Sequence, residues 1–230
     1  MRRRAEQVDQ TRQRIVEATV ELHGSVGPAS TTIAAIAEAA GVTRLTVYRH
    51  FPDEAVLFGA CSAHWLSRQQ PPDPDAWSRT GDPAGRLRAG LADLYRFYRA
   101  GAGMLANVYR DFATLPEAQQ QLLRHQDSHF RRVLAQPFPA ASGERRRLRA
   151  LIGHATSFWT WHSLCIREGL SDHEAVQAMT AMVLAAMPAP QAGPAPSGAA
   201  AAAPDERAAE PPSHRGRCDG HERPFPAARP

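Results

Sequence analysis

The sequence predicts an all-α fold. Apolar residues recur every three or four positions through most of residues 9–187, which is the period of an amphipathic helix. No segment joins the alternation of a β-strand to the turn residues of a hairpin. Glycine, proline and capping residues divide the pattern into about nine helices. Residues 188–230 are rich in proline, alanine and glycine, so we expect a disordered tail that cannot offset its own chain entropy.

The first helix is expected over residues 9–24, because Gly24 and the pair Gly27-Pro28 end its pattern. A seven-residue spacing gives this helix its apolar stripe: Val8, Ile15 and Leu22. Residues 1–8 precede it as a loose basic arm. The arm carries three consecutive arginines: Arg2, Arg3 and Arg4.

Residues 32–51 predict two short helices hinged at a glycine. Apolar residues at 33, 36, 37 and 40 form one face of the first helix. Gly41 can take the left-handed conformation that ends it, and Thr43 is a natural N-cap for the second. Val47 and Phe51 turn toward the first helix. The outward residues are Arg44, Thr46, Tyr48 and His50. A short helix with donors and a ring on its outer face has the shape that enters a DNA major groove.

Helical pattern continues beyond this motif. A fourth helix is expected over residues 53–69, where Asp53 and Glu54 suit the positive N-terminal end. A proline-rich loop over 70–82 stops it. Residues 83–135 are helical again. Their expected breaks lie at Gly101, Gly103 and Pro116, and Pro137 and Pro139 mark another.

Two helices complete the pattern. A long helix is expected over residues 143–168, and Gly169 ends it. Its apolar face is Leu148, Leu151, Ile152, Ala155 and Trp159. A last helix runs over 171–187 after a cap at Ser171 or Asp172. Its aligned apolar residues are Ala175, Met179, Met182 and Ala186.

Composition permits nucleic-acid binding without showing it. The formal charge is +4 with an isoelectric point near 9.4, and the 27 basic residues are all arginine. The planar guanidinium of arginine suits phosphate and guanine better than the ammonium of lysine does. A GC-rich coding bias would give the same excess of arginine. Three scattered cysteines favour a reducing cytosol over a disulfide framework or zinc site. With no visible signal peptide and no apolar run of about 20 residues, we expect a cytoplasmic protein without a membrane partner.

Two stretches within residues 9–65 carry a known pattern. They are Thr-apolar-x-x-Ile-Ala-x-x-Ala-Gly-Val, from Thr32 to Val42, and Thr-Val-Tyr-Arg-His-Phe, from Thr46 to Phe51. Together they resemble the TetR family of bacterial transcriptional repressors. The resemblance implies a homodimer that reads a near-palindromic DNA operator through one helix-turn-helix per subunit. It also implies a C-terminal helical domain that dimerises through its last two long helices and releases DNA when a small-molecule effector binds.

The resemblance divides the chain into three parts. Residues 1–52 would bind DNA, residues 53–187 would hold the effector and the dimer interface, and residues 188–230 would form the tail. The implied DNA-binding residues are Arg3, Arg4, Thr32, Thr43, Arg44, Leu45, Thr46, Tyr48, Arg49 and His50. Arg44 could fork onto guanine, the arm arginines could lie in the minor groove, and Thr32 starts a helix whose free N–H groups can meet a phosphate.

One position departs from the family's pattern. The family usually has a lysine three residues after the final aromatic of the motif, where this chain has Glu54. A carboxylate there repels phosphate, so either the contact moves to Arg49 or the arm, or this helix lies farther from the duplex.

The C-terminal region offers apolar and aromatic residues with a few polar handles, which suit an aromatic or amphipathic effector. The candidate lining residues are Tyr95, Tyr98, Met104, Asn107, Phe130, Phe158, Trp159 and His162. Ala175, Ala178, Ala181 and Ala185 would permit close helix approach in a dimer.

Two other functions stay open at this stage. One is a helical enzyme that begins with a fortuitous helix-turn-helix, although no catalytic constellation is visible and we expect no enzyme activity and no cofactor. The other is a helical dimer that no longer binds DNA, which Glu54 keeps open. His125 and His129 have a zinc-chelating spacing but no third ligand, so we expect a solvated face and no metal.

Overall fold

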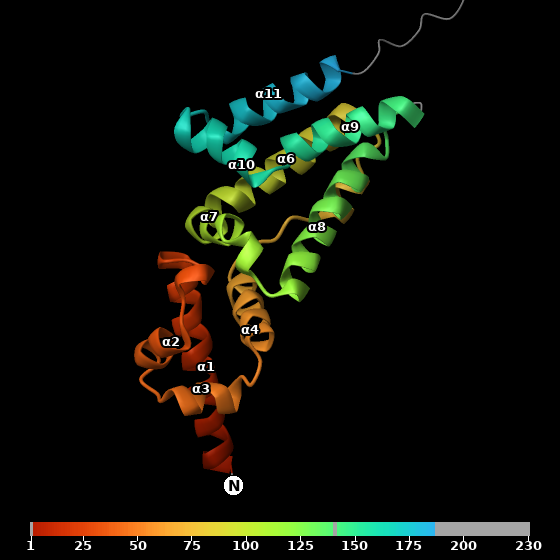
Figure 1. Ribbon diagram of the computed structural model, residues 1–230. Helices are drawn as coiled ribbons and strands as arrows, with labels where there is room; N and C mark the ends of the chain where they lie inside the picture. Colours follow the sequence, from red (N-terminus) through yellow and green to blue (C-terminus); the bar gives the residue numbers. More distant parts are fainter. Residues whose placement is uncertain (1, 140–141, 187–230) are drawn as a thin grey trace, which may run out of the picture. The chain divides into compact units, whose positions relative to one another are not determined.

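A computed structural model describes residues 2–139 and 142–186, and every regular element within them is helical (Figure 1). The α-helices are α1 (Arg2–Ser25), α2 (Ile33–Ala39), α3 (Arg44–His50), α4 (Glu54–Ser67), α5 (Pro74–Ser78), α6 (Pro83–Ala100), α7 (Ala102–Arg110), α8 (Glu117–Ala135), α9 (Ser142–Ala155), α10 (Phe158–Trp161) and α11 (Asp172–Ala185). The shorter elements are the 3₁₀ segments η1 (Pro28–Ser30) and η2 (Phe112–Thr114) and the π-helical η3 (His162–Arg167). The predicted all-α class is confirmed, and the expected tail over 188–230 lies outside the described residues.

α1 is longer than expected. It begins at Arg2, so the prediction of a loose arm over residues 1–8 was wrong. Arginine, alanine, glutamate and glutamine are strong helix formers, and no glycine or proline interrupts them. The seven-residue stripe also starts later than predicted, because Val8 is 46% exposed whereas Ile15 is fully buried.

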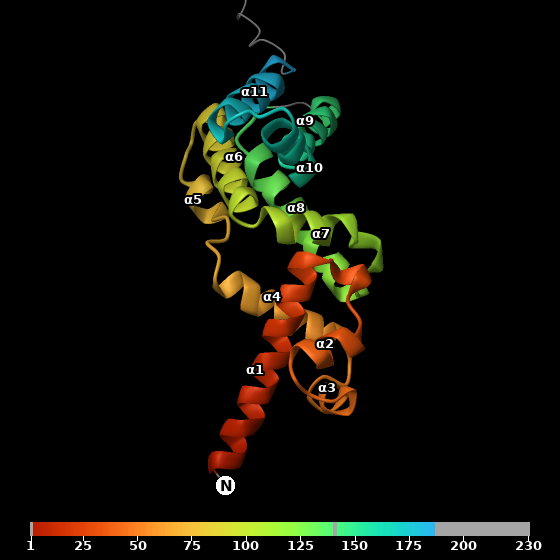
Figure 2. The same cartoon turned by 90° about the vertical axis from the view of Figure 1, so that its left-hand side faces the viewer.

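The N-terminal helices share one buried cluster. α1, α2, α3 and the first half of α4 contribute its residues: Ile15, Val16, Ala18, Ile36, Ala37, Ala40, Val47, Phe51, Leu57 and Cys61. Figures 1 and 2 both show α2 and α3 beside α1. Because four elements supply this cluster, the two short helices owe their stability to packing rather than to propensity.

A second cluster surrounds α6. Leu87, Leu91 and Leu94 on this helix are fully buried, and residues of α7, α8, α9, α10 and α11 pack around them. The segment expected as a loop over 70–82 contributes too, because it contains α5. Asp73 caps this helix at the Ala76 N–H, and the buried Trp77 donates to Asp93 over 2.9 Å. Aspartate before Pro74 is a helix-start signal that the proline content concealed.

The long helix expected over 143–168 is broken at Thr156 and Ser157. The break leaves backbone carbonyls without helical donors, and two tyrosine hydroxyls of α6 take their place. Tyr95 donates to the Ala155 carbonyl over 2.8 Å, and Tyr98 donates to the Thr156 carbonyl over 2.7 Å. The break turns the chain, so Trp159 is 46% exposed instead of lying on a continuous apolar face.

α11 starts at a capping box, in which the Ser171 side chain and Glu174 bond each other's backbone N–H groups. Its inner face differs from the predicted alignment, because Val176 and Val183 are buried with Ala175 while Met179 and Met182 are half-buried. No helix in the described residues is long and apolar enough to cross a bilayer.

The end of α1 is fastened to α7. The Asn107 side-chain amide donates to the carbonyls of His23 and Gly24 over 3.0 and 2.9 Å. Arg110 donates to the Val26 carbonyl over 3.0 Å and pairs with Asp111, which accepts from the Ala29 N–H over 3.1 Å. These bonds satisfy carbonyls that a helix end leaves free, and both ribbon views place this end of α1 against α7.

Candidate nucleic-acid interface and ligand cavity

The turn between α2 and α3 is fixed by backbone hydrogen bonds. Gly41 has a φ of +65°, its N–H donates to the Glu38 carbonyl, and the Val42 N–H donates to the Ala37 carbonyl. This is the Schellman arrangement, which needs a left-handed residue and therefore favours glycine. Thr43 then caps α3 by accepting from the Thr46 N–H over 3.2 Å. The predicted hinge and cap are confirmed.

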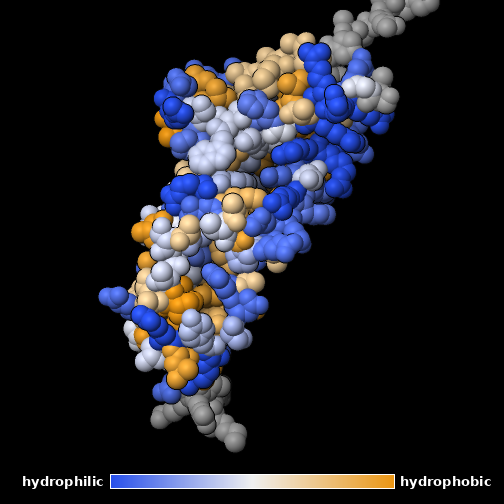
Figure 3. All heavy atoms as spheres, in the orientation of Figure 1, coloured by the Kyte–Doolittle hydropathy of each residue, from blue (hydrophilic) through white to orange (hydrophobic). Residues whose placement is uncertain are grey.

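The inner face of α3 anchors it, since Val47 and Phe51 are buried in the N-terminal cluster. Its outer face is open to solvent: Arg44 and Arg49 are exposed, Leu45 is 78% exposed and Tyr48 is 53% exposed. Figure 3 shows hydrophobic surface bordered by hydrophilic surface over this part of the molecule. The face thus combines guanidinium donors with apolar groups held on a rigid helix.

Three polar side chains of this region have partners within the protein. The Thr32 hydroxyl caps α2 at the Ala35 N–H over 3.1 Å. The Thr43 and Thr46 hydroxyls lie 2.9 Å apart and bond each other. Thr32 and Thr43 therefore set the helix starts, and their hydroxyls are occupied within the protein.

His50 differs from the prediction of an outward side chain. It is half-buried, and its Nε2 is buried without a hydrogen-bond partner in the described structure. Burial lowers the pKa of His50, and the neighbouring Arg49 and Arg12 lower it further. The packing of α3 against its neighbours turns the ring partly inward, so His50 offers less to a ligand than its sequence position suggests.

Arg3, Arg4 and Glu54 are the remaining residues that the sequence singles out near the DNA-binding motif. Arg3 and Arg4 belong to α1, and their side chains lie outside the described residues. Glu54 is the exposed first residue of α4, directly after the cap Asp53. A carboxylate there interacts favourably with the helix dipole, which explains an acidic residue at this position.

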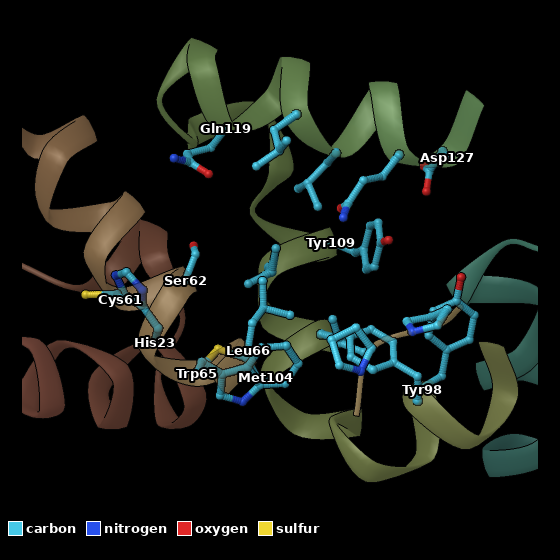
Figure 4. A pocket seen from close by; sticks show the side chains of 18 of the residues that line it. His23, Cys61, Ser62, Trp65, Leu66, Tyr98, Met104, Tyr109, Gln119 and Asp127 are labelled. Carbon is cyan, nitrogen blue, oxygen red and sulfur yellow. The ribbon is translucent and has the colours of Figure 1, made fainter. Parts of the chain in front are cut away.

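A cavity of about 140 Å³ lies between α1, α4, α6, α7 and α8 (Figure 4). Its walls are mainly aromatic and aliphatic. The principal rings are Phe58, Trp65, Phe97, Tyr98, Tyr109 and Phe130. Its polar groups are His23, Cys61, Ser62, Gln119, Gln126 and Asp127. Such a composition suits a small organic ligand with an apolar body.

Only part of the predicted lining reaches this cavity. Tyr98, Met104 and Phe130 line it. Five predicted residues do not: Tyr95, Asn107, Phe158, Trp159 and His162. Tyr95 is buried with its hydroxyl bonded to Ala155, Asn107 caps α1, and Phe158 packs in the core. Trp159 and His162 follow the break in the expected long helix, which moves them away from the cavity.

Sequence reasoning missed the α1 and α4 side of the cavity. His23, Phe58, Cys61 and Trp65 come from helices that the sequence assigns to the DNA-binding unit or to its border. Burial lowers the pKa of His23 to about 4, although nearby Asp111 opposes the shift, and burial raises the pKa of Cys61 to about 12. Both side chains are therefore uncharged near neutral pH. The helical spacing of apolar residues on α1 and α4 was the signal in the sequence that these helices pack inward at this wall.

No group of histidine, cysteine or acidic residues that could hold a metal ion occurs in the described part of the chain. His125 is exposed on α8 and His129 is half-buried there.

Comparison with known proteins bears on residues 15–61, which match the family model for bacterial regulatory proteins of the tetR family. The chain is 40% identical over 57 residues to the HTH-type transcriptional regulator AcrR of Shigella flexneri. It is 45% identical over 60 residues to the HTH-type transcriptional regulator TtgR of Pseudomonas putida. These alignments cover 25% and 26% of this chain and 26% and 29% of the relatives.

Solved structures extend the likeness in fold to most of the chain. The structure of a Clostridium perfringens protein described as a putative fatty acid metabolism regulator covers 77% of this chain at a TM-score of 0.53 and 15% identity. NalD, the secondary repressor of the MexAB-OprM multidrug efflux pump in Pseudomonas aeruginosa, covers 79% at a TM-score of 0.52 and 20% identity. At this identity the likeness concerns the fold alone.

Proposed function

We propose that this chain is a transcriptional regulator of the tetR family that binds double-stranded DNA through α2 and α3, since residues 15–61 match the model of that family and resemble the regulators AcrR and TtgR. The observation that carries this proposal is the exposed outer face of α3. Arg44 and Arg49 supply donors for guanine or phosphate, and Leu45 supplies an apolar group that can meet a thymine methyl.

The proposed regulator is a homodimer, a repressor that an effector releases from a palindromic operator. We assign residues 1–52 to DNA binding, 53–187 to effector binding and dimerisation, and 188–230 to a tail. α4 spans the boundary, because Leu57 and Cys61 belong to the N-terminal cluster while Trp65 packs against the C-terminal one. A ligand that prefers one position of α4 would shift the population of DNA-binding states by that preference.

Three features support effector binding and dimerisation. The cavity is lined by residues of α1, α4, α6, α7 and α8. Ala178, Ala181 and Ala185 of α11 are exposed, and so are Trp159 and Ile166. Small exposed residues on a helix permit close approach by a second copy.

DNA selected from a random-sequence pool, together with the upstream intergenic fragment, tests the DNA-binding proposal. We expect affinity to fall with salt on a log–log slope of about −0.9 for each phosphate contact. Arg44→Ala should relax base choice at one position by about 1–3 kcal/mol. Tyr48→Ala should weaken all sites alike, whereas Arg79→Ala, which removes an exposed arginine beside α5, should change neither. Failure of the folded wild-type protein to retain any fragment at low salt would favour the non-binding helical dimer or the helical enzyme.

A further inference from the structure

The residues that line the cavity differ in charge from the chain as a whole. The chain carries 27 basic and 23 acidic residues. Among the residues that line the cavity, however, Asp127 is the only acidic one and there is no arginine. His23 is neutral near pH 7, because burial holds its pKa at about 4. The walls therefore present one negative group and no positive one.

The Asp127 carboxylate has a charged neighbour, Arg131, but makes no direct contact with it. No hydrogen bond or ion pair reaches it from the described residues. Burial raises the pKa of Asp127, and Arg131 only partly opposes this effect. Arg131, one turn along α8, instead packs over α9, where a Cβ added to Gly153 would lie 3.0 Å from its Nε. A half-buried carboxylate that a neighbouring charge compensates only in part is costly to ionise, and a cation in the cavity would offset that cost.

The surrounding rings also favour a cation. Tyr109 lies near Asp127, since the two groups interact electrostatically, and Figure 4 shows both away from the His23 and Cys61 end of the cavity. Tyr109 stacks on Phe158 with centroids 5.2 Å apart, while Trp65 packs edge-on against Phe97 at 5.8 Å. These contacts hold the rings in place, and fixed aromatic faces attract positive charge.

We propose that this cavity binds small organic cations with a flat apolar body, and that Asp127 is their counter-charge. The inference rests on the proposed function, because it names the chemical class of the effector. An anionic ligand would face Asp127, with no arginine among the residues that line the cavity. A neutral ligand would leave the carboxylate unpaired.

A matched pair of probes tests the charge preference directly. N-methylquinolinium is permanently cationic, whereas quinoline has nearly the same shape and is uncharged at pH 7.5. Binding to the full chain without DNA is measured by calorimetry and by quenching of tryptophan fluorescence, since Trp65 lines the cavity. We expect the cation to bind about tenfold tighter or more, the preference that one desolvated charge contact supplies.

Variants assign that preference to one residue. Asp127→Asn should remove the preference for the cation, and Glu117→Gln, which removes an exposed charge from the same helix, should keep it. Equal binding of the two probes, binding of neither by the folded protein, or an unchanged preference in Asp127→Asn would overturn the proposal. DNA retention is measured separately, so a protein that holds DNA without preferring the cation would refute this inference and leave the proposed function standing.

Discussion

Asn107 on α7 donates its side-chain amide to the backbone carbonyl of His23, in the last turns of α1, over 3.0 Å. A second bond from the same amide reaches Gly24. Asn107 itself is buried, so this contact ties α1, against which α2 and α3 pack, to a helix that forms one wall of the cavity. Movement of α7 on ligand binding would therefore be transmitted to α1.

Removing this tie should lower stability. Asn107→Ala leaves buried carbonyls at the end of α1 without their donor, so we expect the free energy of unfolding to fall by about 1–3 kcal/mol in urea titrations. Gln121→Ala on α8 removes an exposed amide that bonds only to Glu117, and it should cost about 0.5 kcal/mol or less. Equal losses in the two variants would show that the Asn107 bonds carry no special weight.

His23 should make the protein sensitive to mild acid. Burial lowers its pKa from 6.5 to about 4 in the folded protein, so the unfolded chain takes up a proton first as the pH falls. The linkage removes about 2 kcal/mol of stability between pH 7 and pH 5. The unfolding temperature of the wild type should therefore fall more steeply between pH 7 and pH 5 than that of His23→Gln, because glutamine cannot titrate. Parallel pH profiles would contradict the assignment.

Gly41 should tolerate no side chain without strain. Its φ of +65° costs about 1–2 kcal/mol for alanine, so Gly41→Ala should lower the unfolding temperature. Gly103→Ala is the matched control, because Gly103 is exposed within α7 and a Cβ there meets nothing within 4 Å. It should be neutral or stabilise by up to about 1 kcal/mol. The same direction of change in both variants would exclude the conformational argument.

The helix-turn-helix could be predicted because its determinants are local. Gly41 sets the turn, Thr43 caps α3, and Val47 and Phe51 mark the buried face, all within a few residues of one another. Asp53, and either Ser171 or Asp172, marked later helix starts in the same way, and Asp53 and Ser171 act as caps in the structure. Such signals need no knowledge of the rest of the fold.

What the sequence did not reveal depends on distant contacts. The break at Thr156 is possible because Tyr95 and Tyr98, about 60 residues earlier, donate to the freed carbonyls. The hydroxyls of Tyr95 and Tyr98, which the sequence suggested as ligand-binding groups, are therefore used to hold the backbone at this break. His50 and the α1 wall of the cavity likewise follow from how helices pack, which periodicity alone does not specify.

The exposed face of α11 should carry the dimer interface. Ala181→Glu places a charge where a second copy would pack, so light scattering after size-exclusion chromatography should show a shift from dimer to monomer. Ala118→Glu adds the same charge to an exposed position on α8 and should leave the mass unchanged. A wild-type monomer, or a dimer that Ala181→Glu leaves intact, would exclude this face as the interface.

Cross-linking at the outer face of α3 tests the central claim most directly. DNA that the protein selects is substituted with 5-bromouracil and irradiated, and the cross-linked tryptic peptides are identified by mass spectrometry. Cleavage after Arg44 and Arg49 isolates residues 45–49, which contain the exposed Leu45 and Tyr48. We expect this peptide to carry the principal cross-link and to lose it at high salt. Cross-links confined to α8 or α9 would contradict a DNA contact through α3.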